Sequence, residues 1–118
     1  MFKRSLIASV LAFTAPALAD PPIVQNVVVS RYGDLWRFDV TLRHNDTGWG
    51  HYADAWRVVT PDGQPLGTRN LAHPHVKEQP FTRSLSGVRI PEDITEVGIQ
   101  ARDNVDGWAD AITPVRLR

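Results

Sequence analysis

Apolar side chains occupy every second position between residues 36 and 42, and the positions between them are charged or polar. This period of two predicts a half-buried antiparallel strand over residues 35–43. Apolar runs that are alternating or rich in β-branched residues predict six further strands, over residues 23–30, 53–60, 66–72, 81–85, 95–102 and 111–117. The inward positions of these strands predict one shared core that contains Trp36, Phe38, Val40, Trp56, Val97 and Ile99.

No stretch of the chain shows a convincing helical period. Seven short strands at regular spacing, separated by turn residues, predict an all-β protein. We expect a seven-stranded antiparallel sandwich, with a small barrel as the alternative.

The N-terminal residues have the pattern of a secretory signal peptide. Lys3 and Arg4 precede a short apolar run over residues 6–13, and Ala17-Leu18-Ala19 matches the small-x-small pattern that signal peptidase cleaves after. We therefore expect residues 1–19 to be a cleaved signal peptide and residues 20–118 to form a single domain. The expected location is the periplasm, or alternatively the medium. No other apolar segment is long enough to span a membrane.

Charge and composition narrow the possible ligands. Without Lys3 and Arg4 the chain carries 11 basic and 13 acidic residues, a formal charge of −2, and the two signs are interspersed. Nucleic acid and anionic membranes are therefore poor candidate partners. The sequence contains no cysteine, and Met1 is the only methionine. Disulfides and sulfur ligands to a metal are thus excluded, which leaves imidazole and carboxylate groups.

Strand order should bring three loops to one end of the domain. If successive strands run alternately up and down, residues 44–52, 73–80 and 103–108 lie at the same end, as the binding loops of variable immunoglobulin domains do. The turn at residues 61–63, in contrast, should lie at the opposite end. All four histidines of the chain fall in the first two of these loops: His44, His51, His73 and His75.

Clustered imidazoles with carboxylates nearby predict a site for a divalent transition metal. Pro74 favours an extended conformation before it, so His73 and His75 could point to the same side of the chain. Nitrogen and oxygen ligands favour Zn(II) or Cu(II) over Cu(I). The expected ligands are the four histidines with Asp46 and Glu78, and Asp103 and Asp106 are further candidates. The alternative is that these are ordinary loop histidines that bond to water or to carbonyl groups.

The same loops could instead bind a protein or a glycan. Asp46-Thr-Gly-Trp49 and Asp106-Gly-Trp108 are similar turns, and each precedes the sequence Ala-Asp-Ala. Three residues separate the first turn from this sequence, and the second turn is followed by it directly. The aromatic and polar candidates for partner binding are Trp49, Tyr52, Asp106 and Trp108. The two tryptophans could equally serve only to cover the ends of the sheets. Catalysis is not expected, because no nucleophile stands beside a base and no deep pocket is implied.

Two stretches resemble known proteins. Leu85-Ser-Gly-Val-Arg-Ile-Pro, together with the run from Val97 to Trp108, resembles the last strands of a fibronectin type III or immunoglobulin-like domain, and Trp36 fits the same pattern. This resemblance implies the strand arrangement of those sandwiches. The run from Asp46 to Trp56 resembles an uncharacterised group of small exported bacterial proteins, which implies export but no particular activity.

Overall fold

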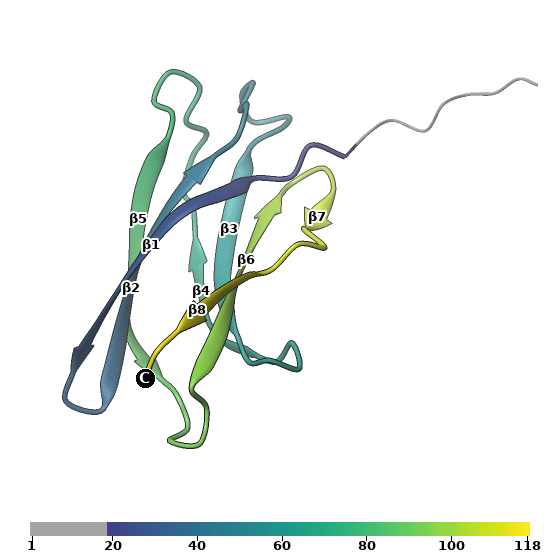
Figure 1. The fold of residues 1–118 in the computed structure, drawn as a ribbon. Coiled ribbons are helices and arrows are strands. Elements are labelled where there is room, and N and C mark those ends of the chain that lie inside the picture. The colour runs from purple at the N-terminus through teal and green to yellow at the C-terminus, as the bar shows by residue number, and fades with distance from the viewer. Residues whose placement is uncertain (1–18) are drawn as a thin grey trace, which may run out of the picture.

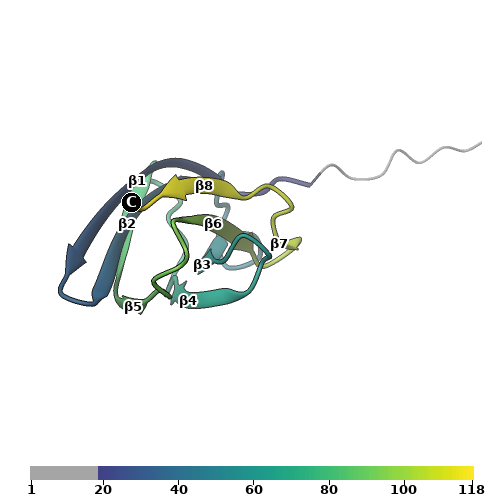
Figure 2. The same cartoon turned by 60° about the horizontal axis from the view of Figure 1, so that its bottom comes forward.

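The computed structural model describes residues 19–118, which form two antiparallel β-sheets. One sheet has the order β1-β2-β5, and the other has the order β4-β3-β6-β7, with β8 paired to the remainder of β6. Figures 1 and 2 show the sheets as two layers. The strands are β1 (Ile23–Tyr32), β2 (Leu35–Arg43), β3 (Ala53–Val59), β4 (Pro65–Asn70), β5 (Phe81–Arg89), β6 (Glu96–Asp103), β7 (Gly107–Trp108) and β8 (Thr113–Arg116). None of the described residues forms a helix that is long and apolar enough to cross a membrane.

The expected core is confirmed. All six residues predicted to share it are buried in one hydrophobic cluster, to which both sheets contribute. In β2 the buried positions alternate with half-buried ones, as the period of two predicted. Leu42, Phe81, Val58 and Ala101 belong to the same cluster. Burial of the inner faces of both sheets is therefore the main stabilising contribution to the fold.

The structure corrects the expected number of strands. The described residues contain eight strands rather than seven, because part of the loop expected at residues 103–108 pairs with β6 as the short strand β7. Gly107, at φ +79°, turns the chain back so that residues 107–108 can reach β6. The last expected strand, residues 111–117, is the shorter β8.

The fifth strand is also longer than predicted. The sequence pattern predicted that it ends at residue 85, but β5 continues to Arg89. The pairing with β2 shifts between Phe38↔Leu85 and Trp36↔Val88, so the strand passes through a β-bulge. Gly87 adopts φ +69° there, a conformation that suits glycine in a bulge. A single glycine therefore interrupted the sequence pattern without ending the strand.

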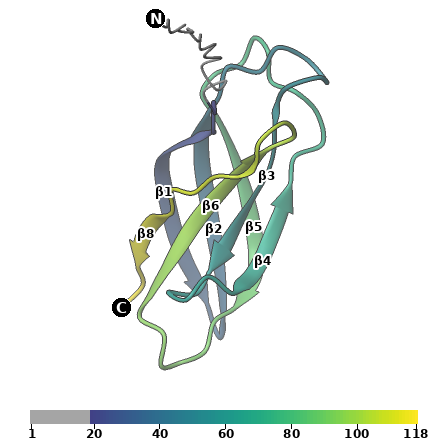
Figure 3. The same ribbon diagram turned by 90° about the vertical axis from the view of Figure 1, so that its right-hand side faces the viewer.

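The three loops expected to meet do lie at one end of the domain, which confirms the topology. They are the β2–β3, β4–β5 and β6–β7 connections, and they lie at the top of Figures 1 and 3. The β1–β2 hairpin, the β3–β4 turn and the β5–β6 connection lie at the opposite end. We call the first end, made of residues 44–52, 71–80 and 104–106 with Asp20, the loop end. The expected signal peptide, except Ala19, falls outside the described residues.

Candidate functional site at the loop end

Asp46 is the centre of the loop end. Its side chain is fully buried and accepts hydrogen bonds from three segments of the chain. Oδ1 lies 2.6 Å from Nδ1 of His44 and accepts the Ala53 amide at 3.0 Å, while Oδ2 accepts the His75 amide at 2.8 Å. Asp46 was predicted to be a metal ligand, but in this structure its oxygens hold the two histidine stretches together.

His44 is buried beside Asp46, and both of its ring nitrogens are engaged. Nδ1 faces the Asp46 carboxylate, and Nε2 lies 2.7 Å from the carbonyl oxygen of Asp20. Both oxygens are hydrogen-bond acceptors, so each ring nitrogen already faces a partner in this structure. His44 could therefore coordinate a metal only by giving up one of these hydrogen bonds.

The second histidine stretch forms a separate cluster. The rings of His73 and His75 lie 4.6 Å apart, and His75 stacks on Phe81 with ring centroids 3.9 Å apart. The guanidinium of Arg83 donates to Nε2 of His75 at 2.9 Å. Burial is the main cause that lowers the pKa of His75, followed by the positive charge of Arg83. His75 is thus a neutral ring whose Nε2 is already occupied.

His51 lies on the other side of the loop end, next to buried Asp103. A tight turn closed by the Gly48 and His51 backbones positions the ring, and His44 packs edge-on against it at 4.9 Å. Nε2 of His51 lies 3.4 Å from Oδ1 of Asp103, whose side chain is 0% exposed. Oδ1 is already taken by the amides of Val105 and Asp106, as in an Asx turn.

Two buried polar atoms at this point have no hydrogen-bond partner within residues 19–118. They are Nε2 of His51 and Oδ2 of Asp103. His51, Asp103 and Asp106 each offer a ligand atom within 4.8 Å of the others, and His51 also forms such a group with Asp20 and His44. Among the described residues, neither of these two groups of three includes His73, His75, Asp46 or Glu78. The structure thus divides the four predicted histidine ligands into two separate pairs.

Sequence reasoning missed three residues that shape the loop end. Asn104 joins two loops, since it accepts the Tyr52 amide at 2.8 Å and donates to the Trp49 carbonyl at 3.0 Å. Gln79 joins the β4–β5 loop to the β2–β3 loop, because its side chain accepts the His44 amide and donates to the His75 carbonyl of its own loop. Asp20 contacts both His44 and Asp106. Amides in loops carry no sequence periodicity, so no pattern could have assigned these partners.

The predicted partner-binding aromatics have different surroundings. Trp49 is 66% exposed and packs edge-on against Tyr52 with ring centroids 5.5 Å apart. Trp108 is half-buried on the outer face of its sheet, where the Arg57 guanidinium lies 3.9 Å above the ring. Asp106 is exposed and belongs to the group around His51. Trp49 with Tyr52 is therefore the aromatic pair that is available to a partner.

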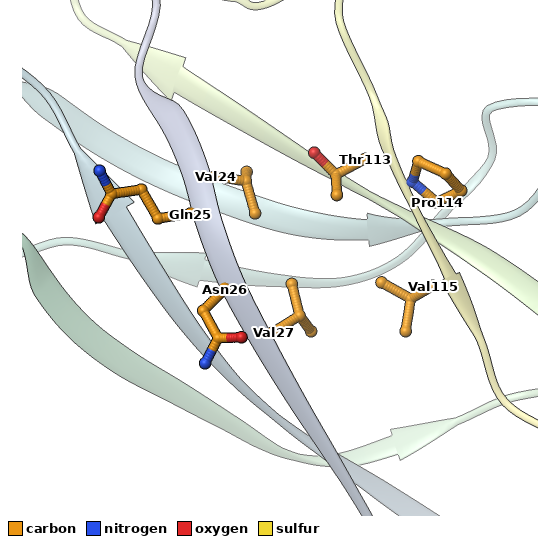
Figure 4. Close-up of a pocket in the computed structure, with 7 residues that line it drawn as sticks. All are labelled: Val24, Gln25, Asn26, Val27, Thr113, Pro114 and Val115. Carbon is orange, nitrogen blue, oxygen red and sulfur yellow. The ribbon is translucent and has the colours of Figure 1, made fainter.

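A groove of about 280 Å³ lies between the neighbouring edges of the two sheets. Figure 4 shows Val24 and Val27 on β1 across from Thr113 and Val115 on β8. Its lining contains no histidine, aspartate or glutamate. The groove therefore offers apolar surface and amide groups, but no ionisable ligand atoms.

The sequence of this chain is similar to that of a known protein. The chain is 38% identical over 91 residues to a protein of Halomicrobium mukohataei named "Putative lipoprotein". The match covers 77% of this chain and 44% of that protein, so the chain spans less than half the length of its relative. No family model matches the chain, and no solved structure matches it.

Proposed function

We propose that this protein is an exported, non-enzymatic domain that binds a divalent transition metal at the loop end. The observation that carries the proposal is the pair of buried atoms without partners, His51 Nε2 and Asp103 Oδ2, beside the carboxylate of Asp106. A buried polar group that lacks a partner costs about 1–3 kcal/mol. A bound cation would satisfy the carboxylate and the imidazole lone pair together.

The spacing of these groups suits a transition metal. Two ligands that each lie about 2.0–2.2 Å from a tetrahedral zinc ion are ~3.4 Å apart. Nε2 of His51 lies 3.4 Å from Oδ1 of Asp103, which belongs to the same carboxylate as the unpartnered Oδ2. One imidazole with two carboxylates favours Zn(II) or Cu(II), whereas Ca(II) and Mg(II) prefer oxygen ligands alone. The ligand set that we propose is thus His51, Asp103 and Asp106.

Two further parts of the proposal concern fold family and location. The strand orders β1-β2-β5 and β4-β3-β6-β8 support an immunoglobulin or fibronectin type III arrangement, in which two antiparallel sheets pack face to face. The signal-like N-terminal residues and the name of the Halomicrobium relative both support export. We propose the periplasm as the location, with release to the medium as the alternative.

Calorimetry and thermal unfolding with Zn(II), Cu(II) and Mg(II) test metal binding. A free metal concentration one hundred times the dissociation constant should stabilise the domain by about 2.7 kcal/mol. His51→Ala should abolish this stabilisation by Zn(II) and Cu(II). His73→Ala is the matched control, since His73 is an exposed histidine at the same end but outside both ligand groups. If Zn(II), Cu(II) and Mg(II) all stabilise both variants equally and weakly, the proposal is refuted.

The second candidate is a protein- or glycan-binding accessory module. The observation in its favour is the exposed Trp49, held edge-on by Tyr52 and accompanied by exposed Val105 on the neighbouring loop. Flat exposed aromatic rings offer large contact area at a small cost in side-chain entropy. Retention on insoluble peptidoglycan, chitin and cellulose tests the glycan arm of this candidate. Retention that Trp49→Ala abolishes and His51→Ala preserves would favour it over metal binding.

A further inference from the structure

Asp20, the first residue after the expected cleavage point, lies between two of the loops. Its backbone nitrogen donates to Oδ2 of Asp106 at 3.3 Å. Its carbonyl oxygen lies 2.7 Å from Nε2 of His44, and its own carboxylate oxygen lies 3.6 Å from the same nitrogen. The start of the domain is therefore fixed to the β2–β3 and β6–β7 loops before β1 begins.

His51 connects Asp20 to the proposed metal site. One group of close ligand atoms contains Asp20, His44 and His51, and the other contains His51, Asp103 and Asp106. The Asp20 nitrogen and the Asp106 oxygen are separated by 3.3 Å. That separation matches the ~3.4 Å expected between two ligands of one tetrahedral ion. The main-chain nitrogen of Asp20 thus lies at ligand-to-ligand distance from one member of the proposed set, Asp106.

Cleavage after Ala19 would change the chemistry of this nitrogen. While Ala19 precedes Asp20, the nitrogen belongs to a peptide bond, and its lone pair is delocalised into the carbonyl group. After cleavage it is a primary amine, which can coordinate a metal once it has released one proton to solvent. The amine and the Asp20 carboxylate belong to one residue, so they could bind one ion as a chelate.

We propose that the α-amino group of Asp20, created by removal of residues 1–19, is a nitrogen ligand of the metal bound by His51, Asp103 and Asp106. This inference rests on the proposed function, because it adds a ligand to the same site. Its consequence is that processing regulates metal affinity. The precursor lacks one nitrogen ligand, so the protein acquires its full affinity only after the signal peptide has been removed.

The test compares two forms of the domain that differ only at the N-terminus. One form begins at Asp20, and the other carries Gly-Ser-Gly before it, which moves the free amine by up to ~10 Å. Both contain all eight strands. The extension should leave the fold intact, because the contacts of Asp20 described above exist with Ala19 attached. Equal melting temperatures without metal would establish that the two forms are matched.

The measurements are Zn(II) affinity by competition with a chromophoric chelator and Cu(II) electron paramagnetic resonance. We expect at least tenfold weaker Zn(II) binding by the extended form. The Cu(II) spectrum should show two nitrogen ligands, from His51 and the amine, in the form that begins at Asp20, and one in the extended form. Equal affinity and equal nitrogen counts would overturn this inference but leave the proposed function standing. Absence of binding by both forms would refute both.

Discussion

Replacement of Asp46 by alanine should destabilise the domain more than any other single change at the loop end. The side chain is fully buried and accepts three hydrogen bonds, from the His44 ring and from the amides of Ala53 and His75. Hydrogen bonds to a charged group contribute about 1.5–3 kcal/mol each. These three share one carboxylate and are not additive. We therefore expect Asp46→Ala to lower the free energy of unfolding by about 4 kcal/mol.

Asp46→Asn separates the loss of charge from the loss of shape. The amide keeps one acceptor oxygen, but its NH₂ group must face a donor, either the backbone amide of His75 or the His44 ring. We expect its destabilisation to be about 2 kcal/mol, between wild type and Asp46→Ala. Asp93→Ala is the matched control, because Asp93 is an exposed aspartate in the β5–β6 connection at the opposite end. Its effect should be within about 0.5 kcal/mol.

Urea unfolding followed by tryptophan fluorescence, with a chelator present, measures these differences in the absence of metal. A small domain of this kind has a total stability of about 5–15 kcal/mol, so a loss of 4 kcal/mol moves the unfolding midpoint strongly. The slope of the free energy of unfolding against urea concentration should stay unchanged, since the sheets remain folded in the variants. A loss of less than about 1 kcal/mol in Asp46→Ala would refute the view that this carboxylate holds the three segments together.

Two further predictions concern the core and the pH dependence of stability. Trp36→Ala removes a buried ring from the shared cluster and should cost about 3–5 kcal/mol in urea unfolding, whereas a melting temperature within a few degrees of wild type would contradict the assigned inner face. The pKa of His75 is lowered from 6.5 by burial and by Arg83, so the unfolded chain binds a proton more readily than the folded domain. The free energy of unfolding should therefore fall as the pH drops below 6.5, and the decrease should be smaller in His75→Gln. If the free energy of unfolding changes equally with pH in wild type and His75→Gln between pH 7.5 and 5.5, the lowered pKa of His75 is contradicted.

The sheets could be predicted from the sequence because their signal is local and periodic. Residues 35–43 form β2 with the predicted bounds, since burial of one face requires an apolar residue at every second position. The errors occurred where the backbone departs from that period. The strand predicted to end at residue 85 continues through a bulge at Gly87, and Gly107 allows a short strand to pair with β6 within an expected loop.

The candidate site could be predicted only in part. Alternating strand directions place the histidine loops at one end, and the structure confirms this. The division of the histidines into two pairs depends on which polar atoms meet across loops, and strand topology does not determine that. Asp46 was a plausible ligand by residue type, yet three donors converge on it. Asp103 was one of several acidic candidates, and what distinguishes it is a buried oxygen, Oδ2, without a hydrogen-bond partner within residues 19–118.

The strand order also determines when this protein can fold. In each sheet, one pair of neighbouring strands comes from segments about forty residues apart in the sequence. In the first sheet Leu42 pairs with Phe81, and in the second Val58 pairs with Ile99. A nascent chain that lacks β5 and β6 can form only the β1–β2 and β3–β4 hairpins, and isolated hairpins are marginally stable in water. Pairing over such distances is also slow, because the entropy of loop closure is lost before the contacts form. A chain with this topology stays unfolded until nearly all of it has been synthesised, and an unfolded chain is the form in which a polypeptide can be threaded through a narrow secretion channel.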